Sequence, residues 1–173
     1  TSAEVDVLEV SGSGNMVVEN LRLTGGRYGL HLNSASNVAL GNVRSSNNTW
    51  GVFLAGSTWG IDFDRCVLAA NTNGGISANA ATIQSNRWNR GVIWNSPVAI
   101  TAFSNALTVS NSVLGGGATL FGNHSVVGDF NVVGPPAVPG AGVVRFSDWQ
   151  NAGRGWSRSV RADAVFSSGG AGD

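Results

Sequence analysis

A repeat with a period of about 22 residues, in the range typical of solenoid proteins, constrains the fold of this chain more than any other sequence feature. Each copy has a glycine followed by an apolar, a variable and a second apolar or small residue. The copies are Gly29–Leu32, Gly51–Leu54, Gly75–Ala78 and Gly91–Trp94. In a solenoid, each repeat packs against its neighbours. The sequence therefore predicts a stack of similar units.

A second motif alternates with the first and has the pattern of short strands. It occurs in Val18–Leu23, Leu40–Val43, Phe63–Leu68, Ile83–Trp88 and Val109–Leu114, which begin roughly 20 to 26 residues apart. A hairpin meander does not fit, because two-residue turns would reverse the chain between neighbours. A parallel coil does fit, and it stacks equivalent residues in columns about 4.8 Å apart. A leucine-rich repeat is the main alternative, but its fixed leucine and asparagine pattern is not kept.

The amino-acid composition supports a coil with many tight turns, and it argues against some classes of binding partner. The 173 residues include 25 Gly, 18 Asn and 20 Ser, which favour tight turns and left-handed backbone conformations. Ten Arg, no Lys and ten acidic residues give zero net charge, so we expect no nucleic-acid partner. No apolar run approaches the roughly 20 residues that span a bilayer, so we expect no membrane span. The single cysteine, Cys66, is expected to be a buried, inert thiol.

The segments NMVVENLRLTGG, IDFDRCVLAAN, ATIQSNRWNRG and LTVSNSVLGGG carry a family resemblance. They resemble the right-handed parallel β-helix repeats of secreted bacterial proteins related to pectate lyases, over roughly Val5 to Val133. The resemblance implies an all-β, single-stranded right-handed parallel β-helix of about six coils. It also implies a secreted or cell-surface protein that acts on or binds polysaccharide.

The C-terminal part of the chain is expected to close the solenoid. Residues 1–133 would form the coils, and residues 134–173 would form a Pro- and Gly-rich loop and a C-terminal cap. Ser147 and Gln150 have the spacing of a capping box and Gly153 supplies a stop, which predicts a short helix from Ser147 to Ala152. The other end has no such cover, since Val5 to Val10 already have the pattern of a strand. We expect an end-to-end contact with a partner there, or continuation into a longer protein.

Two aspartates are the first candidate catalytic residues. Asp62 and Asp64 lie two apart on one expected strand, so their side chains should share its outer face, with the two Cα atoms about 6 to 7 Å apart. Such a pair can act as acid and base on a glycosidic bond or bind Ca²⁺ through oxygen ligands. The alternative interpretation is that the two aspartates have no specific role and only keep the outer face of the strand soluble. The motif alignment places Asp64 beside Gln84 and Asp62 beside Thr82.

His31 and Arg87 complete the candidate catalytic set. His31 follows Tyr28, and with nearby carboxylates it would suit proton abstraction by a uronate lyase or epimerase. The alignment stacks His31 with Phe53, Ser77 and Ile93. Arg87 and Arg90 flank Trp88 and could bind a uronate carboxylate, or pair with the aspartates. The alternative for His31 is an ordinary surface histidine.

Aromatic residues are the candidate substrate-binding groups. Trp50, Phe53 and Trp59 could stack on sugar rings, together with Arg90 as an ionic contact, although packing of turns is the alternative. Trp88 falls at the inward phase of its strand and is expected in the core.

Two classes of function follow. One is a lyase or epimerase of an extracellular acidic polysaccharide, using Asp62, Asp64, His31 and Arg87 on one shared face, with no cofactor other than Ca²⁺ at the two aspartates. The sequence lacks the catalytic patterns of pectate lyases, polygalacturonases and alginate epimerases, and it has no lysine for a lysine-based mechanism. The other class is a non-catalytic surface, adhesion or structural β-helix module that binds glycan or serves as a scaffold.

Overall fold

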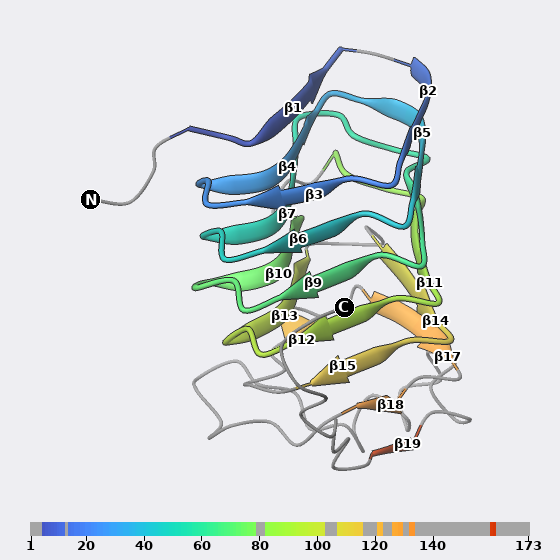
Figure 1. The fold of residues 1–173 in the computed structure, drawn as a ribbon. Helices are drawn as coiled ribbons and strands as arrows, with labels where there is room; N and C mark the ends of the chain where they lie inside the picture. The colour runs from blue at the N-terminus through green and yellow to red at the C-terminus, as the bar shows by residue number, and fades with distance from the viewer. Residues whose placement is uncertain are drawn as a thin grey trace.

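The structure is a computed structural model that describes residues 5–12, 14–78, 82–102 and 107–115, together with four later strand segments. The chain winds as a right-handed coil that contributes strands in turn to three parallel sheets (Figure 1). The predicted all-β parallel solenoid is confirmed, and the described part of the chain makes about five turns. No helix occurs among the described residues. The predicted helix from Ser147 to Ala152, and all of the cap except one short strand, lie outside them.

Each sheet takes one strand from each coil, and every strand between the two ends of a sheet pairs in parallel with its equivalents in the coils before and after. Sheet A contains β1 (Leu8–Ser11), β4 (Tyr28–Asn33), β7 (Trp50–Ala55), β10 (Gly74–Ala78), β13 (Val98–Ala102) and β16 (Phe121–Gly122). Sheet B contains β2 (Gly14–Glu19), β5 (Ser36–Gly41), β8 (Asp62–Asp64), β11 (Asn86–Asn89), β14 (Leu107–Ser110) and β17 (Val126–Asp129). Sheet C contains β3 (Arg22–Thr24), β6 (Arg44–Ser46), β9 (Val67–Ala69), β12 (Val92–Trp94), β15 (Val113–Gly115), β18 (Val132–Val133) and β19 (Val160–Arg161). We call the outer surfaces of these sheets face A, face B and face C.

Residues in the left-handed conformation turn the chain between sheets. The B-to-C corner has one per coil, with φ near +50° to +60°, at Asn20, Asn42, Arg65, Arg90 and Asn111. Similar columns occur at the other corners, and most of their members are Gly, Asn or Ser. These residue types reach positive φ at lower cost than others, because they lack a side chain or have a short polar one. The excess of asparagine, glycine and serine in the sequence is therefore explained in part by the corners of the coil, which need these residue types.

The register of the fourth coil differs from the motif alignment. Phe63 pairs with Trp88 rather than with Ile83, so Asp62 lies beside Arg87 and Asp64 beside Asn89. The predicted neighbours Thr82 and Gln84 are therefore wrong. The sequence separation of equivalent residues is 22 in the first coils, between Asn20 and Asn42, but 25 between Asp62 and Arg87. The extra residues enter at corners, where they leave the strands intact.

The same lengthening moves the last copy of the first motif. Ile93 lies in sheet C, paired with Leu68, so its predicted place above Ser77 is wrong. Thr101 occupies that place in sheet A, and the column runs His31, Phe53, Ser77, Thr101.

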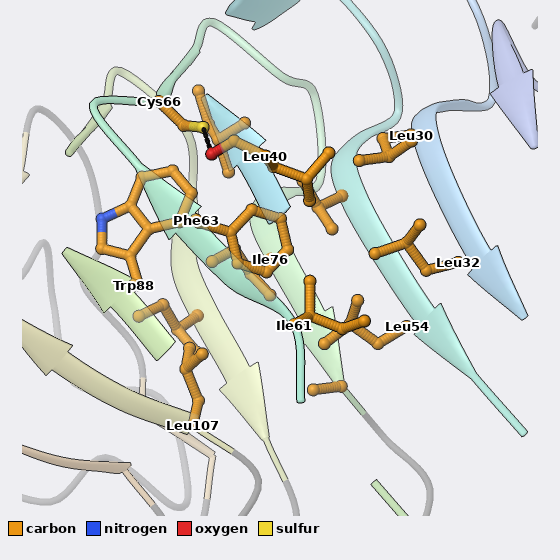
Figure 2. Close-up of a cluster of buried hydrophobic side chains, with 14 of the residues drawn as sticks. Leu30, Leu32, Leu40, Leu54, Ile61, Phe63, Cys66, Ile76, Trp88 and Leu107 are labelled. Atoms are coloured by element: carbon orange, nitrogen blue, oxygen red, sulfur yellow. Dashed lines mark hydrogen bonds between the residues drawn. The ribbon is translucent and has the colours of Figure 1, made fainter. Parts of the chain in front are cut away.

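The core lies between the three sheets and is filled by inward side chains from every coil. Figure 2 shows part of it, where the rings of Phe63 and Trp88 pack with their centroids 5.5 Å apart. Trp88 is fully buried, which confirms its predicted core position. Cys66 is also buried, with Sγ 3.5 Å from the Leu40 carbonyl oxygen. Burial raises the pKa of its thiol to about 11, so the thiol stays protonated and unreactive at neutral pH.

Buried asparagines stabilise the corner between sheets C and A. Asn48 accepts a hydrogen bond from the Gly26 amide at 2.9 Å, and Asn71 accepts one from the Asn48 amide at 3.1 Å. Asn71 Nδ2 donates to the Ser45 carbonyl, and its amide donates to Ser96 Oγ. Each corner is thereby tied to the next, and buried polar groups of the corner are paired.

Within the described part of the chain, nothing covers the core at the first coil. β1, β2 and β3 have no partner on their outer side among the described residues. A hollow of about 600 Å³ opens there, lined by residues of β1 and β2 and by Leu21. No helix in the described part of the chain is long and apolar enough to cross a membrane.

Candidate functional site

The structure separates the four candidate catalytic residues onto two sheets. His31 lies on β4 in sheet A, whereas Asp62, Asp64 and Arg87 lie on β8 and β11 in sheet B. Face B therefore brings the aspartates together with Arg87, and it does not include His31. The single shared face that the catalytic interpretation requires is not present.

Asp62 is held by the strand beside it. Asp62 and Asp64 point outward on either side of the inward Phe63, as the strand alternation predicts. Arg87 lies opposite Asp62 in register and donates two hydrogen bonds, from Nε to Oδ1 at 3.0 Å and from Nη2 to Oδ2 at 2.6 Å. This two-point contact fixes both side chains on the surface of the sheet.

Asp64 is held by two arginines of the B-to-C corner. Arg90 donates to Oδ1 at 2.7 Å and to Oδ2 at 2.6 Å, and Arg65 Nε lies 3.1 Å from Oδ2. The hydrogen bond and charge of Arg90 lower the pKa of Asp64 against the smaller opposing effect of burial. Both aspartates thus accept bidentate contacts. Calcium binding or acid catalysis there would first require the arginines to leave.

His31 sits in a separate ionic cluster on face A. Its Nδ1 lies 2.8 Å from Asp6 Oδ2 and 4.0 Å from Glu9 Oε1. Arg27 donates to both oxygens of Asp6, at 3.0 and 3.3 Å. Burial acts to raise the pKa of Asp6, but hydrogen bonds and charges from Arg27 and His31 outweigh it and lower that pKa. This cluster was not predicted from the sequence, although Glu9 and His31 are one repeat apart and pair in register on β1 and β4.

Three ligand atoms of this cluster could approach one metal ion. Asp6, Glu9 and His31 each offer an atom within 4.8 Å of the others. The Arg27 guanidinium already holds both Asp6 oxygens, so an ion would have to displace a cation. We therefore treat the cluster as an ionic contact between the segment before β1 and the second coil.

Two of the predicted substrate-binding aromatics use their rings within the protein. Phe53 stacks on Tyr28 with centroids 4.2 Å apart, and His31 packs edgewise against it at 5.4 Å. The Arg27 guanidinium covers the Tyr28 ring at 4.6 Å. Trp50 lies over Gly74, where an added β-carbon would meet the indole ring. Both Phe53 and Trp50 therefore have packing partners within the protein.

Trp59 differs from the other candidate aromatics. It is 43% exposed and forms β-bridges to Ser36 and Gln84, which extend sheet B toward its corner with sheet A. Trp59 therefore lies where the chain enters sheet B, just before Ile61 and Asp62. Of the predicted substrate-binding residues, Trp59 and Arg90 lie along sheet B, and Trp50 and Phe53 lie on sheet A.

Comparisons with protein-family models, with curated proteins and with solved structures found no match to this chain. Its function therefore has to be inferred from its residues and from their geometry.

Proposed function

We propose that this chain is a non-catalytic solenoid module that binds extracellular polysaccharide along face B. The exposed Trp59, where the chain enters sheet B, carries this proposal. An indole face stacks on the apolar face of a sugar ring, which gives binding without any reaction. The resemblance of the repeats to secreted pectate-lyase-like proteins supports a polysaccharide ligand and a secreted or cell-surface location.

The polar side chains of face B suit an extended polymer. Outward columns there continue from Asp62 through Arg87 to Thr108 and from Asp64 through Asn89 to Ser110. Successive side chains in a column are about 4.8 Å apart. Asn89 accepts hydrogen bonds from Ser110 and Asn111, so this part of the surface is ordered before a ligand arrives. Ordered donors and acceptors lower the entropy cost of binding.

The placement of ionisable groups favours binding over catalysis. Acid and base catalysis needs its groups within reach of the same bond. The two aspartates are each held by an arginine, and His31 lies on another sheet. The lyase or epimerase alternative would require these ion pairs to open and a base to come from elsewhere.

Substitution of Trp59 tests the proposal on a panel of neutral and acidic polysaccharides. Trp59→Ala should weaken binding to the preferred polymer about 3- to 10-fold, because one ring contact is lost. Trp59→Phe should keep most of the affinity. Leu21→Ala removes another exposed apolar side chain, at the corner with sheet C, and serves as the matched control.

Two results would overturn the proposal. One is equal binding by the wild type and Trp59→Ala. The other is the appearance of unsaturated uronate products, detected by their ultraviolet absorbance, when the wild type is incubated with the panel.

A further inference from the structure

Two arginines stand side by side on face C. Arg22 on β3 and Arg44 on β6 occupy paired positions of neighbouring parallel strands. Leu23 and Ser45, the next residues along, are both buried, so the arginines point outward, and both are exposed. Adjacent strands are about 4.8 Å apart, which places two positive charges next to each other in one column.

Neither arginine has an acidic partner among the described residues. The arginines of the neighbouring coils, by contrast, pair with Asp6, Asp62 or Asp64: Arg27, Arg65, Arg87 and Arg90. Glu19 is the nearest carboxylate along the chain, and its side chain folds against Gly41, where an added β-carbon would lie 3.0 Å from Oε1. Like charges directly opposite each other on neighbouring strands destabilise a sheet. The pair therefore carries an electrostatic cost that the described part of the chain does not offset.

Hydroxyl groups and apolar residues surround the arginine pair on face C. Thr24 and Ser46 are paired two residues further along the same strands, so their side chains share face C with the arginines. Val67 and Val92 continue the arginine column into the next coils. The result is a compact patch of two guanidinium groups and two hydroxyls, all hydrogen-bond donors.

We propose that the Arg22–Arg44 pair binds the carboxylate or sulfate groups of an acidic polysaccharide. Guanidinium groups bind such planar or trigonal oxyanions through paired, charge-assisted hydrogen bonds. An anion between the two arginines removes their mutual repulsion. This assignment rests on the proposed function and adds the charge class of the ligand and a second contact surface, across the corner from face B.

A polysaccharide fits this patch better than a nucleic acid does. Nucleic-acid binding without sequence preference depends on many phosphate contacts along a basic track. Here the chain has zero net charge, and the column beyond Arg44 turns apolar at Val67 and Val92. Two adjacent arginines match one or two acid groups on an otherwise uncharged polymer.

Binding of chemically matched polymers tests this assignment. Carboxymethyl dextran and dextran sulfate carry the two kinds of acid group on one backbone, and unmodified dextran is the neutral counterpart. At low salt the wild type should bind one or both charged forms more tightly than dextran. The double variant Arg22→Gln/Arg44→Gln should lose about tenfold or more of that affinity, because charge-assisted hydrogen bonds are removed.

Arg65→Gln is the control for loss of a surface arginine, since it removes a charge at the adjoining corner from an arginine already paired with Asp64. It should change binding less than twofold. The double variant should unfold at the same temperature as the wild type or higher, because it relieves like-charge repulsion. Dextran sulfate or carboxymethyl dextran should then raise the unfolding temperature of the wild type more than that of the double variant.

Several outcomes would overturn the assignment. They are unchanged binding of both charged dextrans by the double variant, an equal loss in Arg65→Gln, or tighter arginine-dependent binding of a single-stranded DNA oligomer. A failure of the proposed function would be recognised by a different result. In that case Trp59→Ala would leave polysaccharide binding unchanged, whatever the effect of the arginine variants.

Discussion

Asp6 shows how one residue ties the start of the described chain to the second coil. Its side chain is 9% exposed and contacts both Arg27, in the turn before β4, and His31 on β4. Burial opposes ionisation of the carboxyl group, but these cationic partners outweigh it and hold its pKa below the ordinary 3.8. The contact spans 21 to 25 residues along the chain and so acts between coils.

We predict that this contact stabilises the protein only while Asp6 is ionised. Because the folded-state pKa is lowered, the stabilisation is complete above pH 3.8 and is lost as the pH falls through the lower, folded value. Asp6→Asn should therefore reduce the free energy of unfolding by about 1 kcal/mol near neutral pH, and the difference should shrink below about pH 4. Urea unfolding of both proteins across this pH range measures it.

Glu9→Gln is the control for this experiment. Glu9 lies 4.0 Å from His31 Nδ1 and is half-exposed, so its removal should change stability little at any pH. A pH-independent difference between the wild type and Asp6→Asn would contradict the assignment of the effect to ionisation.

At the scale of the element, each corner depends on a residue that can adopt a left-handed backbone conformation. Ala70 takes a left-handed conformation, with φ of +52°, in the column that also contains Gly25, Asn47 and Asn95. Alanine has a β-carbon that crowds the backbone in this conformation, and it has no polar side chain to compensate. The corner between sheets C and A thus contains one residue that is poorly suited to its backbone.

We predict that Ala70→Asn stabilises the protein by about 1 kcal/mol, because asparagine tolerates positive φ better. The measurement is the unfolding temperature, together with the free energy of unfolding in urea. Ala39→Asn is the matched control, since Ala39 is an exposed position in the middle of β5, where asparagine is disfavoured. If both substitutions changed stability in the same direction, the backbone explanation would be wrong.

The same corners explain how far the sequence could predict the strands. The first coils have nearly equal lengths and keep the motifs in register, so the pairing of His31 with Phe53 and of Gly41 with Asp64 was predictable. The fourth coil was not, because Ile83 and Trp88 are both fully buried and either could continue the inward column. Only the packing of Trp88 against Phe63 and the extra corner residues decide between them.

At the scale of the whole molecule, the candidate functional residues lie on three different faces of the solenoid. The sequence could predict that Asp62 and Asp64 share an outer surface, because that follows from strand alternation within one motif. It could not predict that His31 lies on a different sheet, since both motifs have the same period and their relative orientation depends on corner geometry. The repeat alone predicts that Arg22 and Arg44 are neighbours. Only the structure shows that Asp62 and Asp64 pair with other arginines and so do not neutralise this pair.

The first coil, which no described strand covers, exposes strand edges and apolar side chains at one end of the solenoid. Unpaired strand edges and apolar surface favour addition of another strand or another molecule. Val17 on β2 is 67% exposed beside the hollow of about 600 Å³, and Met16 and Leu21 are also exposed there. Within the described part of the chain, no strand pairs with the outer edge of this coil.

We predict that the chain self-associates through this end as its concentration rises. Val17→Lys should suppress the association, because a charged side chain at an open strand edge opposes pairing. Sedimentation velocity over a range of concentrations measures it, with Ser57→Lys as the control, since Ser57 is an exposed corner residue in the middle of the solenoid. Equal suppression by both lysines would indicate a general charge effect, and a wild type that stays monomeric throughout would show that the open end does not drive association.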